Sequence, residues 1–129
     1  MKISNFNTAS ACEKGAWVII KDFDDLDTDM RVKVLGVDSK AYKSQINRLV
    51  KMNEQNKNKV DMEKLEASSI RTLVAITIDW ENIEDDEENT IPFTKEMAQT
   101  IYENSPHISN QIIEFAKERQ NFLEKKQVG

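Results

Sequence analysis

The sequence is poor in the residues that all-β and disulfide-bonded proteins need. It contains three glycines, two prolines and a single cysteine, Cys12, in 129 residues. So few glycines and prolines leave little material for the many tight turns of a β-sandwich, and one cysteine excludes an internal disulfide. With 39% hydrophobic and 32% charged residues, the composition instead suits one globular, mainly helical domain.

Basic charge and long hydrophobic runs are scarce as well. The formal net charge is −5, which argues against nucleic acid as a partner because phosphate binding requires a basic surface. No apolar run approaches the roughly 20 residues that cross a bilayer, so we expect no membrane insertion. The first residues are too polar for a secretory signal, and together with the lone cysteine they predict a protein of the reducing cytosol.

The N-terminal third predicts a β-hairpin after an irregular start. Residues 1–14 show no periodicity and predict a flexible arm. Two short β-branched runs, 16–20 and 31–37, flank an aspartate-rich turn at 22–29. Alternating apolar residues around such a turn are typical of a hairpin.

A helix is expected immediately after the hairpin. Asp38 and Ser39 can cap it, because a short side-chain oxygen accepts a hydrogen bond from a main-chain N–H of the first turn. The polar stretch 53–59 predicts the connection to the next helix. The apolar face of the helix is formed, at helical spacing, by Tyr42, Ile46, Leu49 and Val50.

The segment 61–83 allows two interpretations. As a helix it would be apolar nearly all round, with Leu65, Leu73, Ile76, Trp80 and Ile83 on one face. As a strand, residues 74–80 alternate strictly between apolar and smaller or polar side chains. Because no helix-breaking residue interrupts the segment, we favour one long helix.

The C-terminal part predicts two further helices. A purely acidic loop, 81–88, precedes the first of them, which Thr94 caps. Pro106 stands at the start of the second, where a missing N–H costs nothing, and the apolar spacing continues to Leu123.

The expected fold class is therefore mainly α (α+β): an N-terminal β-hairpin followed by about four helices. The expected organisation is a flexible arm, a single domain and a disordered tail, over residues 1–14, 15–123 and 124–129.

No catalytic constellation is evident. His107 is the only histidine and has no nucleophile–base motif near it. Cys12 has no motif partner either, and a small buried or incidental thiol is the simpler interpretation. The acids of 81–88 lie in one loop, which cannot hold two carboxyl groups in the different environments that glycoside hydrolysis requires.

The aspartates of the hairpin turn do not fit a calcium loop. An EF-hand needs a glycine at its sixth position and a glutamate at its twelfth, whereas counting from Asp22 gives Asp27 and Lys33. We therefore expect a protein that binds another protein, with no enzymatic activity, catalytic residue, cofactor or metal.

Several stretches together resemble the tail assembly chaperones of long-tailed bacteriophages. The shared features are a tryptophan followed by an acid, an acidic loop, a proline–phenylalanine pair before a capped helix, and a hairpin-to-helix opening. In this sequence they are Ile78–Ile83, Ile91–Ala98, Ser105–Phe115, Gly15–Val18 and Gly36–Ser39 with Tyr42.

This resemblance implies a function in the host cytoplasm. Such chaperones coat the long helical tape measure protein, keep it soluble, and are displaced when the major tail tube protein polymerises around it. They are absent from the mature virion, and some form homo-oligomers. The alternative is a structural minor tail or head–tail connector component of the virion.

Candidate client-binding residues lie in and after the segment that carries the resemblance. They are Trp80, Ile83, Pro92, Phe93 and Tyr102. The tryptophan has two possible roles, in the core or at the interface. The effect of its truncation on stability distinguishes them.

Overall fold

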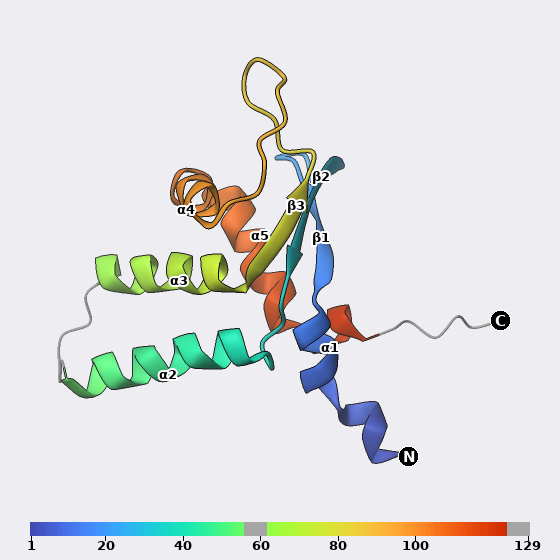
Figure 1. Cartoon of the computed structure of the whole chain (residues 1–129), viewed down its shortest axis with the longest axis vertical. Helices are drawn as coiled ribbons and strands as arrows, with labels where there is room; N and C mark the ends of the chain where they lie inside the picture. Colours follow the sequence, from blue (N-terminus) through green and yellow to red (C-terminus); the bar gives the residue numbers. More distant parts are fainter. Residues whose placement is uncertain (56–61, 124–129) are drawn as a thin grey trace.

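The computed structural model, which describes residues 1–55 and 62–123, confirms the predicted β-hairpin (Figure 1). Strand β1 (Ala16–Lys21) pairs antiparallel with β2 (Asp27–Val34). The turn between them is shorter than expected. Oδ1 of Asp22 accepts hydrogen bonds from the N–H groups of both Asp24 and Leu26, so the aspartate closes the turn.

A third strand replaces the second half of the long helix that the sequence favours. Helix α3 (Met62–Ile76) ends where strand β3 (Thr77–Glu81) begins. Strand β3 pairs antiparallel with β2, so the sheet order is β1-β2-β3. The prediction of one helix across 61–83 is therefore wrong from residue 77 onward. Residues 77–80 of the alternating segment lie in the strand, whereas Val74 and Ile76 belong to α3.

Side chains from the start of β3 and from beyond the acidic loop explain why the helix stops here. Lys95 Nζ donates hydrogen bonds to the main-chain oxygens of Val74, at 2.8 Å, and Thr77, at 2.6 Å. The Thr77 hydroxyl lies 2.6 Å from the oxygen of Leu73 and 2.7 Å from the hydroxyl of Tyr102. These groups satisfy carbonyls that a helix end leaves without N–H partners.

Helix α2 (Lys40–Gln55) begins as predicted. The Ser39 hydroxyl accepts a hydrogen bond from the N–H of Tyr42 at 3.2 Å, which confirms the N-cap. The helix extends into the polar stretch that the sequence assigns to the following connection, and residues 56–61 of that stretch lie outside the described part of the chain.

Helices α4 (Lys95–Asn104) and α5 (Pro106–Lys117) also start where expected. The Thr94 hydroxyl accepts a hydrogen bond from the N–H of Met97 at 3.0 Å, and Pro106 occupies the first turn of α5. Both starts follow from local chemistry, because capping and N1 proline preferences need no tertiary contact.

The last helix ends earlier than its apolar spacing suggests. Glu118 is extended, and a 3-10 helix η2 (Arg119–Phe122) follows. The turn brings Phe122 back onto Phe115, with ring centroids 5.6 Å apart. The prediction that the helix continues to Leu123 is therefore wrong, and the predicted tail at 124–129 lies outside the described residues.

The chain opens with regular structure and not with an irregular arm. A 3-10 helix η1 (Ile3–Phe6) precedes helix α1 (Thr8–Lys14). Cys12 of α1 is fully buried against Gly36, where an added Cβ would clash with Sγ of Cys12. The arm prediction is wrong for α1, because its buried face is created by a segment distant in sequence.

An ionic cluster ties α1 to the rest of the domain. Arg119 donates hydrogen bonds to both carboxylate oxygens of Asp38, from Nε at 2.7 Å and from Nη2 at 3.0 Å, and Thr8 donates a third. The Arg119 and Thr8 hydrogen bonds lower the pKa of Asp38 from 3.8 to about 2. The cluster therefore favours the charged form of this carboxyl.

This shift predicts a pH dependence of stability. A folded-state pKa below the unfolded value adds stability that is present above the unfolded pKa and is lost as pH falls. The free energy of unfolding should therefore drop between the unfolded pKa of 3.8 and the folded pKa of about 2. Urea titrations across this range should show a smaller drop for Asp38→Asn. Equal drops for both proteins would contradict the assignment.

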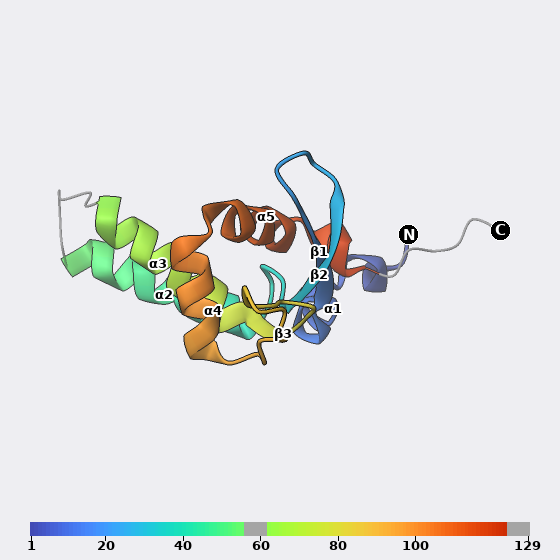
Figure 2. The same ribbon diagram turned by 90° about the horizontal axis from the view of Figure 1, so that it is seen from above.

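The elements form a sheet with one covered face and a projecting helical arm. In Figures 1 and 2, α4 and α5 lie on one side of the sheet, and the antiparallel pair α2–α3 extends away from it. The core lies between the sheet and the helices, where Val18, Val32, Trp80, Ile112 and Ala116 are buried. Within residues 1–55 and 62–123, five α-helices and a three-stranded antiparallel sheet confirm the α+β class. In the described residues no helix is long and apolar enough to cross a membrane.

Candidate protein-binding site

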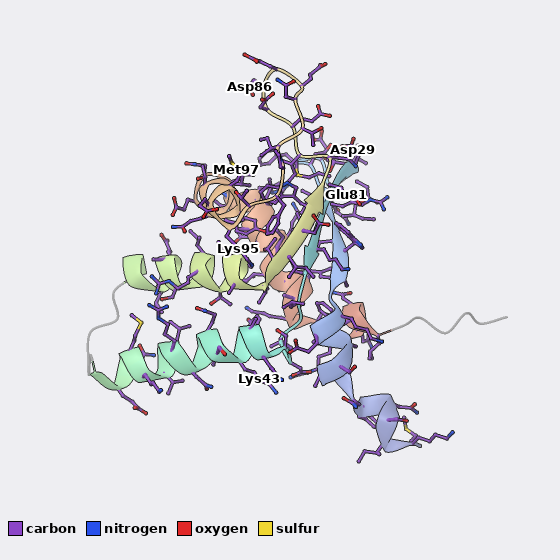
Figure 3. The ribbon with its side chains drawn as sticks, viewed as in Figure 1. Asp29, Lys43, Glu81, Asp86, Lys95 and Met97 are labelled. Carbon is purple, nitrogen blue, oxygen red and sulfur yellow. The ribbon has the colours of Figure 1, made fainter. Side chains whose placement is uncertain are left out.

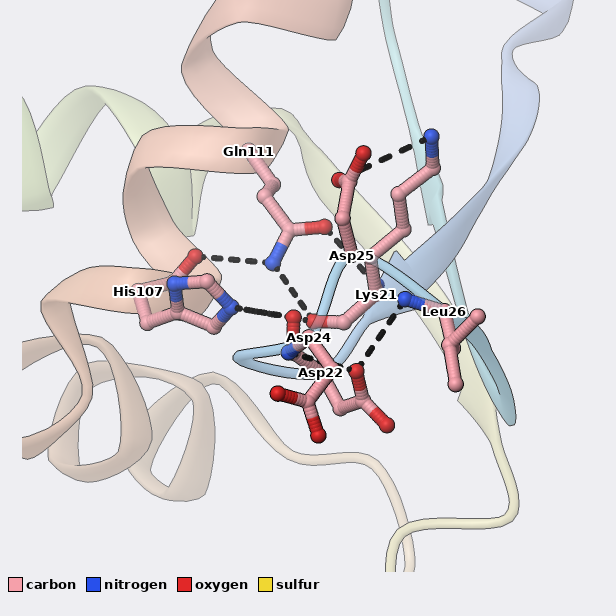
Figure 4. A network of polar contacts seen from close by, with 7 residues as sticks. All are labelled: Lys21, Asp22, Asp24, Asp25, Leu26, His107 and Gln111. Atoms are coloured by element: carbon pink, nitrogen blue, oxygen red, sulfur yellow. Dashed lines mark hydrogen bonds and ion pairs between the residues drawn. The ribbon is translucent and has the colours of Figure 1, made fainter.

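The two residues considered for chemistry have structural contacts instead. His107 Nε2 lies 3.1 Å from the main-chain oxygens of both Lys21 and Asp22 (Figure 4). Its ring also stacks on Phe23, with the ring centroids 4.2 Å apart. Cys12 is buried, and burial raises the pKa of its thiol, which disfavours the nucleophilic thiolate. Among the described residues, no group of three or more His, Cys, Asp and Glu side chains could hold a metal.

Three of the predicted client-binding residues meet at the base of the acidic loop. Trp80 Nε1 donates to the main-chain oxygen of Ile91 at 2.7 Å, and its ring packs edge-on against Phe93 at 5.0 Å. Ile83 is buried beside them and accepts a hydrogen bond from Ile91 N–H. Of the predicted client-binding residues, only Pro92 is exposed. The cluster anchors the loop to the sheet, and Trp80, at 6% exposure, is a core residue.

Tyr102, the fifth predicted residue, lies on α4, away from this cluster. Its side chain is 2% exposed, and burial raises the pKa of the hydroxyl to about 12. It does reach one surface feature, because it contributes to the lining of a groove between α3, α4 and α5.

This α3–α5 groove encloses about 430 Å³. Apolar residues from three helices form much of its wall, and Glu66 and Glu103 add acidic groups. Sequence reasoning missed it, although the apolar residues on nearly all sides of α3 were a signal that the helix has more than one neighbour. Its apolar lining is Leu65, Ile70, Leu73, Tyr102, Pro106 and Ile113.

The outer face of α2 combines exposed apolar side chains with a lysine. Helix α3 is the main neighbour of α2, and the opposite side of α2 carries Ile46 and Val50, which are 41% and 50% exposed. Figure 3 shows Lys43 projecting on this side. We define the α2 outer face as Lys43, Ile46, Asn47 and Val50, which share one side of the helix at i, i+3, i+4 and i+7.

The α2 outer face is also the basic part of an acidic protein. Helix α2 carries four basic residues and one acidic residue, whereas the whole chain has a net charge of −5. Asp86 marks the tip of the acidic loop at the opposite end of the molecule from Lys43 (Figure 3). Such separation of charge orients a partner that carries both signs. The basic residues of α2 are Lys40, Lys43, Arg48 and Lys51.

The comparisons with known proteins place the chain in a family. A family profile described as YdaY prophage protein matches residues 37–128, which is more than two thirds of the 129 residues. The matched range includes α2, α3, β3, α4 and α5 and leaves out the β1–β2 hairpin. No curated protein and no solved structure matches the chain significantly. The chain therefore belongs to the YdaY prophage protein family.

Proposed function

We propose that this prophage-family protein is a tail assembly chaperone that binds the tape measure protein of its phage without catalysing a reaction. In this proposal it keeps the client soluble in the host cytoplasm and yields it to the major tail tube protein. The observation that carries the proposal is the α2 outer face, an exposed strip of apolar and basic side chains on a projecting helix.

The geometry of the arm suits a helical client. Ile46 and Val50 are spaced by one helical turn, so they can interdigitate with apolar residues of a second helix that lies along α2. A long helical protein with bare apolar stripes aggregates, and covering those stripes keeps it in solution. Projection of α2 from the sheet leaves room for the client on the side away from α3 (Figure 1).

The size of the face supports a reversible contact. Burying one aliphatic side chain is worth about 1.5–3 kcal/mol, and association itself costs several kcal/mol. Two such side chains with flanking lysines therefore give modest affinity per site. A chaperone that must be displaced by polymerising tail subunits needs such a contact.

The sign of the charge adds a requirement on the client. Lys43 lies beside the apolar pair, Lys51 directly follows Val50, and Lys40 lies three residues before Lys43. Acidic residues beside the apolar stripe of the client would complement them, whereas a basic stripe would be repelled.

The experiment is co-expression with fragments of the tape measure protein of the same phage. The double variant Ile46→Glu, Val50→Glu should bind the client roughly tenfold to a hundredfold more weakly, with a corresponding loss of soluble client. Because both side chains are substantially exposed, the variant should keep nearly the stability of the unchanged protein.

A matched control uses the same chemistry elsewhere. Ile3→Glu, Phe6→Glu replaces two exposed apolar residues, 90% and 65% accessible, in η1. It should leave client solubility unchanged. If the unchanged protein fails to increase the soluble fraction of the client, or if purified virions contain the protein in stoichiometric amounts, the chaperone proposal is wrong.

A further inference from the structure

Strand β1 forms one edge of the sheet, and part of that edge is open. Leu35, just after β2, donates its N–H to the main-chain oxygen of Ile76, on the β3 side. Main-chain groups alternate in direction along a strand, so odd-numbered residues of β2 point toward β3 and even-numbered residues point toward β1. Val32 pairs with Val18, which leaves the main-chain groups of Trp17 and Ile19 directed away from the sheet. Among the described residues, neither makes a main-chain hydrogen bond beyond the hairpin.

At Lys21, the other end of the β1 edge, the outward main-chain groups already have hydrogen-bond partners. The Gln111 side chain accepts a hydrogen bond from Lys21 N–H at 2.8 Å and donates one to Lys21 O at 3.0 Å, as a neighbouring strand would. His107 adds a contact to the same oxygen (Figure 4). Capping one end of an edge strand protects it from uncontrolled pairing. The open stretch is therefore limited to the residues before Lys21.

A hollow of about 540 Å³ runs beside this open stretch, between β1 and α5. An edge strand facing a helix across a groove is an arrangement that accepts an extended peptide as an added strand. Ile19, which is 42% exposed, and Phe115 offer apolar contacts, and Glu114 gives the helix side a negative charge. The full lining is Val18, Ile19, Lys21, His107, Asn110, Gln111, Glu114, Phe115 and Asn121.

We propose that an extended segment of a partner protein binds in this groove as a fourth strand, hydrogen-bonded to Trp17 and Ile19. Its apolar side chains contact Ile19 and Phe115, and a lysine or arginine lies beside Glu114. A second copy of this chain is a poorer occupant, because it would bring its own Glu114 toward the same edge, where like charges repel. This site is separate from the α2 outer face and does not depend on the chaperone proposal.

The probe is a synthetic peptide of about seven residues with valines on both faces, one lysine on the face toward α5 and threonine at the other positions, a length and composition typical of a strand. Its addition should slow hydrogen exchange of the Trp17 and Ile19 amides about tenfold, while Val18, already paired with β2, changes little. The same peptide N-methylated on alternate amides should not bind, because it lacks the donors for the edge. A version with glutamate in place of lysine should bind more weakly.

Protein variants provide the reciprocal test. Ile19→Pro removes an outward N–H, a change that edge strands tolerate, and should abolish binding of the valine–lysine peptide. Ile19→Thr keeps the N–H and should retain binding. If Ile19→Pro does not fold, the N-methylated peptide still decides the question. Equal binding of the methylated peptide, protection confined to other amides, or a dimer that pairs β1 with β1 would each overturn the proposal.

Discussion

Replacing Trp80 with alanine is expected to lower the free energy of unfolding by about 3–5 kcal/mol, which is the usual cost of truncating a large buried aromatic residue. The ring is 6% exposed, packs edge-on against Phe93, and donates a hydrogen bond to Ile91. Its loss would leave both a cavity and a carbonyl without its donor. Domains of this size are stabilised by only about 5–15 kcal/mol, so the variant should be largely destabilised.

The second tryptophan provides an internal control. Trp17 is 36% exposed on the outer face of β1, so Trp17→Ala should cost much less than Trp80→Ala when both variants are unfolded in guanidinium titrations. The comparison also separates the two roles that the sequence allows for Trp80. If Trp80→Ala folds with nearly unchanged stability but loses the tape measure client, the residue belongs to an interface and the core assignment is wrong.

Replacing Lys95 with methionine is expected to cost about 1–3 kcal/mol, because charged hydrogen-bond donors to helix-end carbonyls are removed while the aliphatic part is kept. Lys95 is the group that joins the end of α3 to the start of β3, with contacts to Val74 and Thr77. Burial lowers the pKa of this lysine, because desolvation disfavours its charged form.

Lys51→Met is a suitable control, since Lys51 is exposed on α2. It should change the free energy of unfolding by less than about 0.5 kcal/mol, as is usual for surface positions. If the two methionine variants are equally stable, Lys95 does not stabilise the junction, and another contact must explain why the helix ends there.

Elements with local signals were predicted well. Ser39, Thr94 and Pro106 start their helices as expected, because a cap or an N1 proline acts on main-chain groups within one turn. The hairpin was found for a similar reason, since its alternation and its aspartate turn lie within one stretch of sequence.

Elements that depend on contacts with residues distant in sequence could not be predicted from the sequence. Residues 77–81 carry no helix breaker, and they become a strand because β2 offers an edge and Lys95 and Tyr102 cap the helix before them. Helix α1 likewise depends on a distant contact, because its Cys12 packs against Gly36. Where a sequence pattern is compatible with both a helix and a strand, the tertiary contacts available to each decide which one forms.

The candidate site residues show the same difference between what the sequence indicates and what distant contacts decide. Trp80, Ile83 and Tyr102 stand out in the sequence as large apolar residues, but the fold buries them. Ile46 and Val50 were expected on the apolar face of their helix. They remain exposed because α3 covers only one side of α2, which no periodicity in the sequence can reveal.

The sequence by itself determined the class of molecule: a mainly helical α+β chain with a net negative charge and a match to a prophage protein family. Composition and local capping suffice for that, because they act within a few residues. The tertiary structure alone decided which apolar residues form the core and which stay exposed on α2 and along β1. Exposure depends on which elements pack together, and that packing is set by residues far apart in the chain.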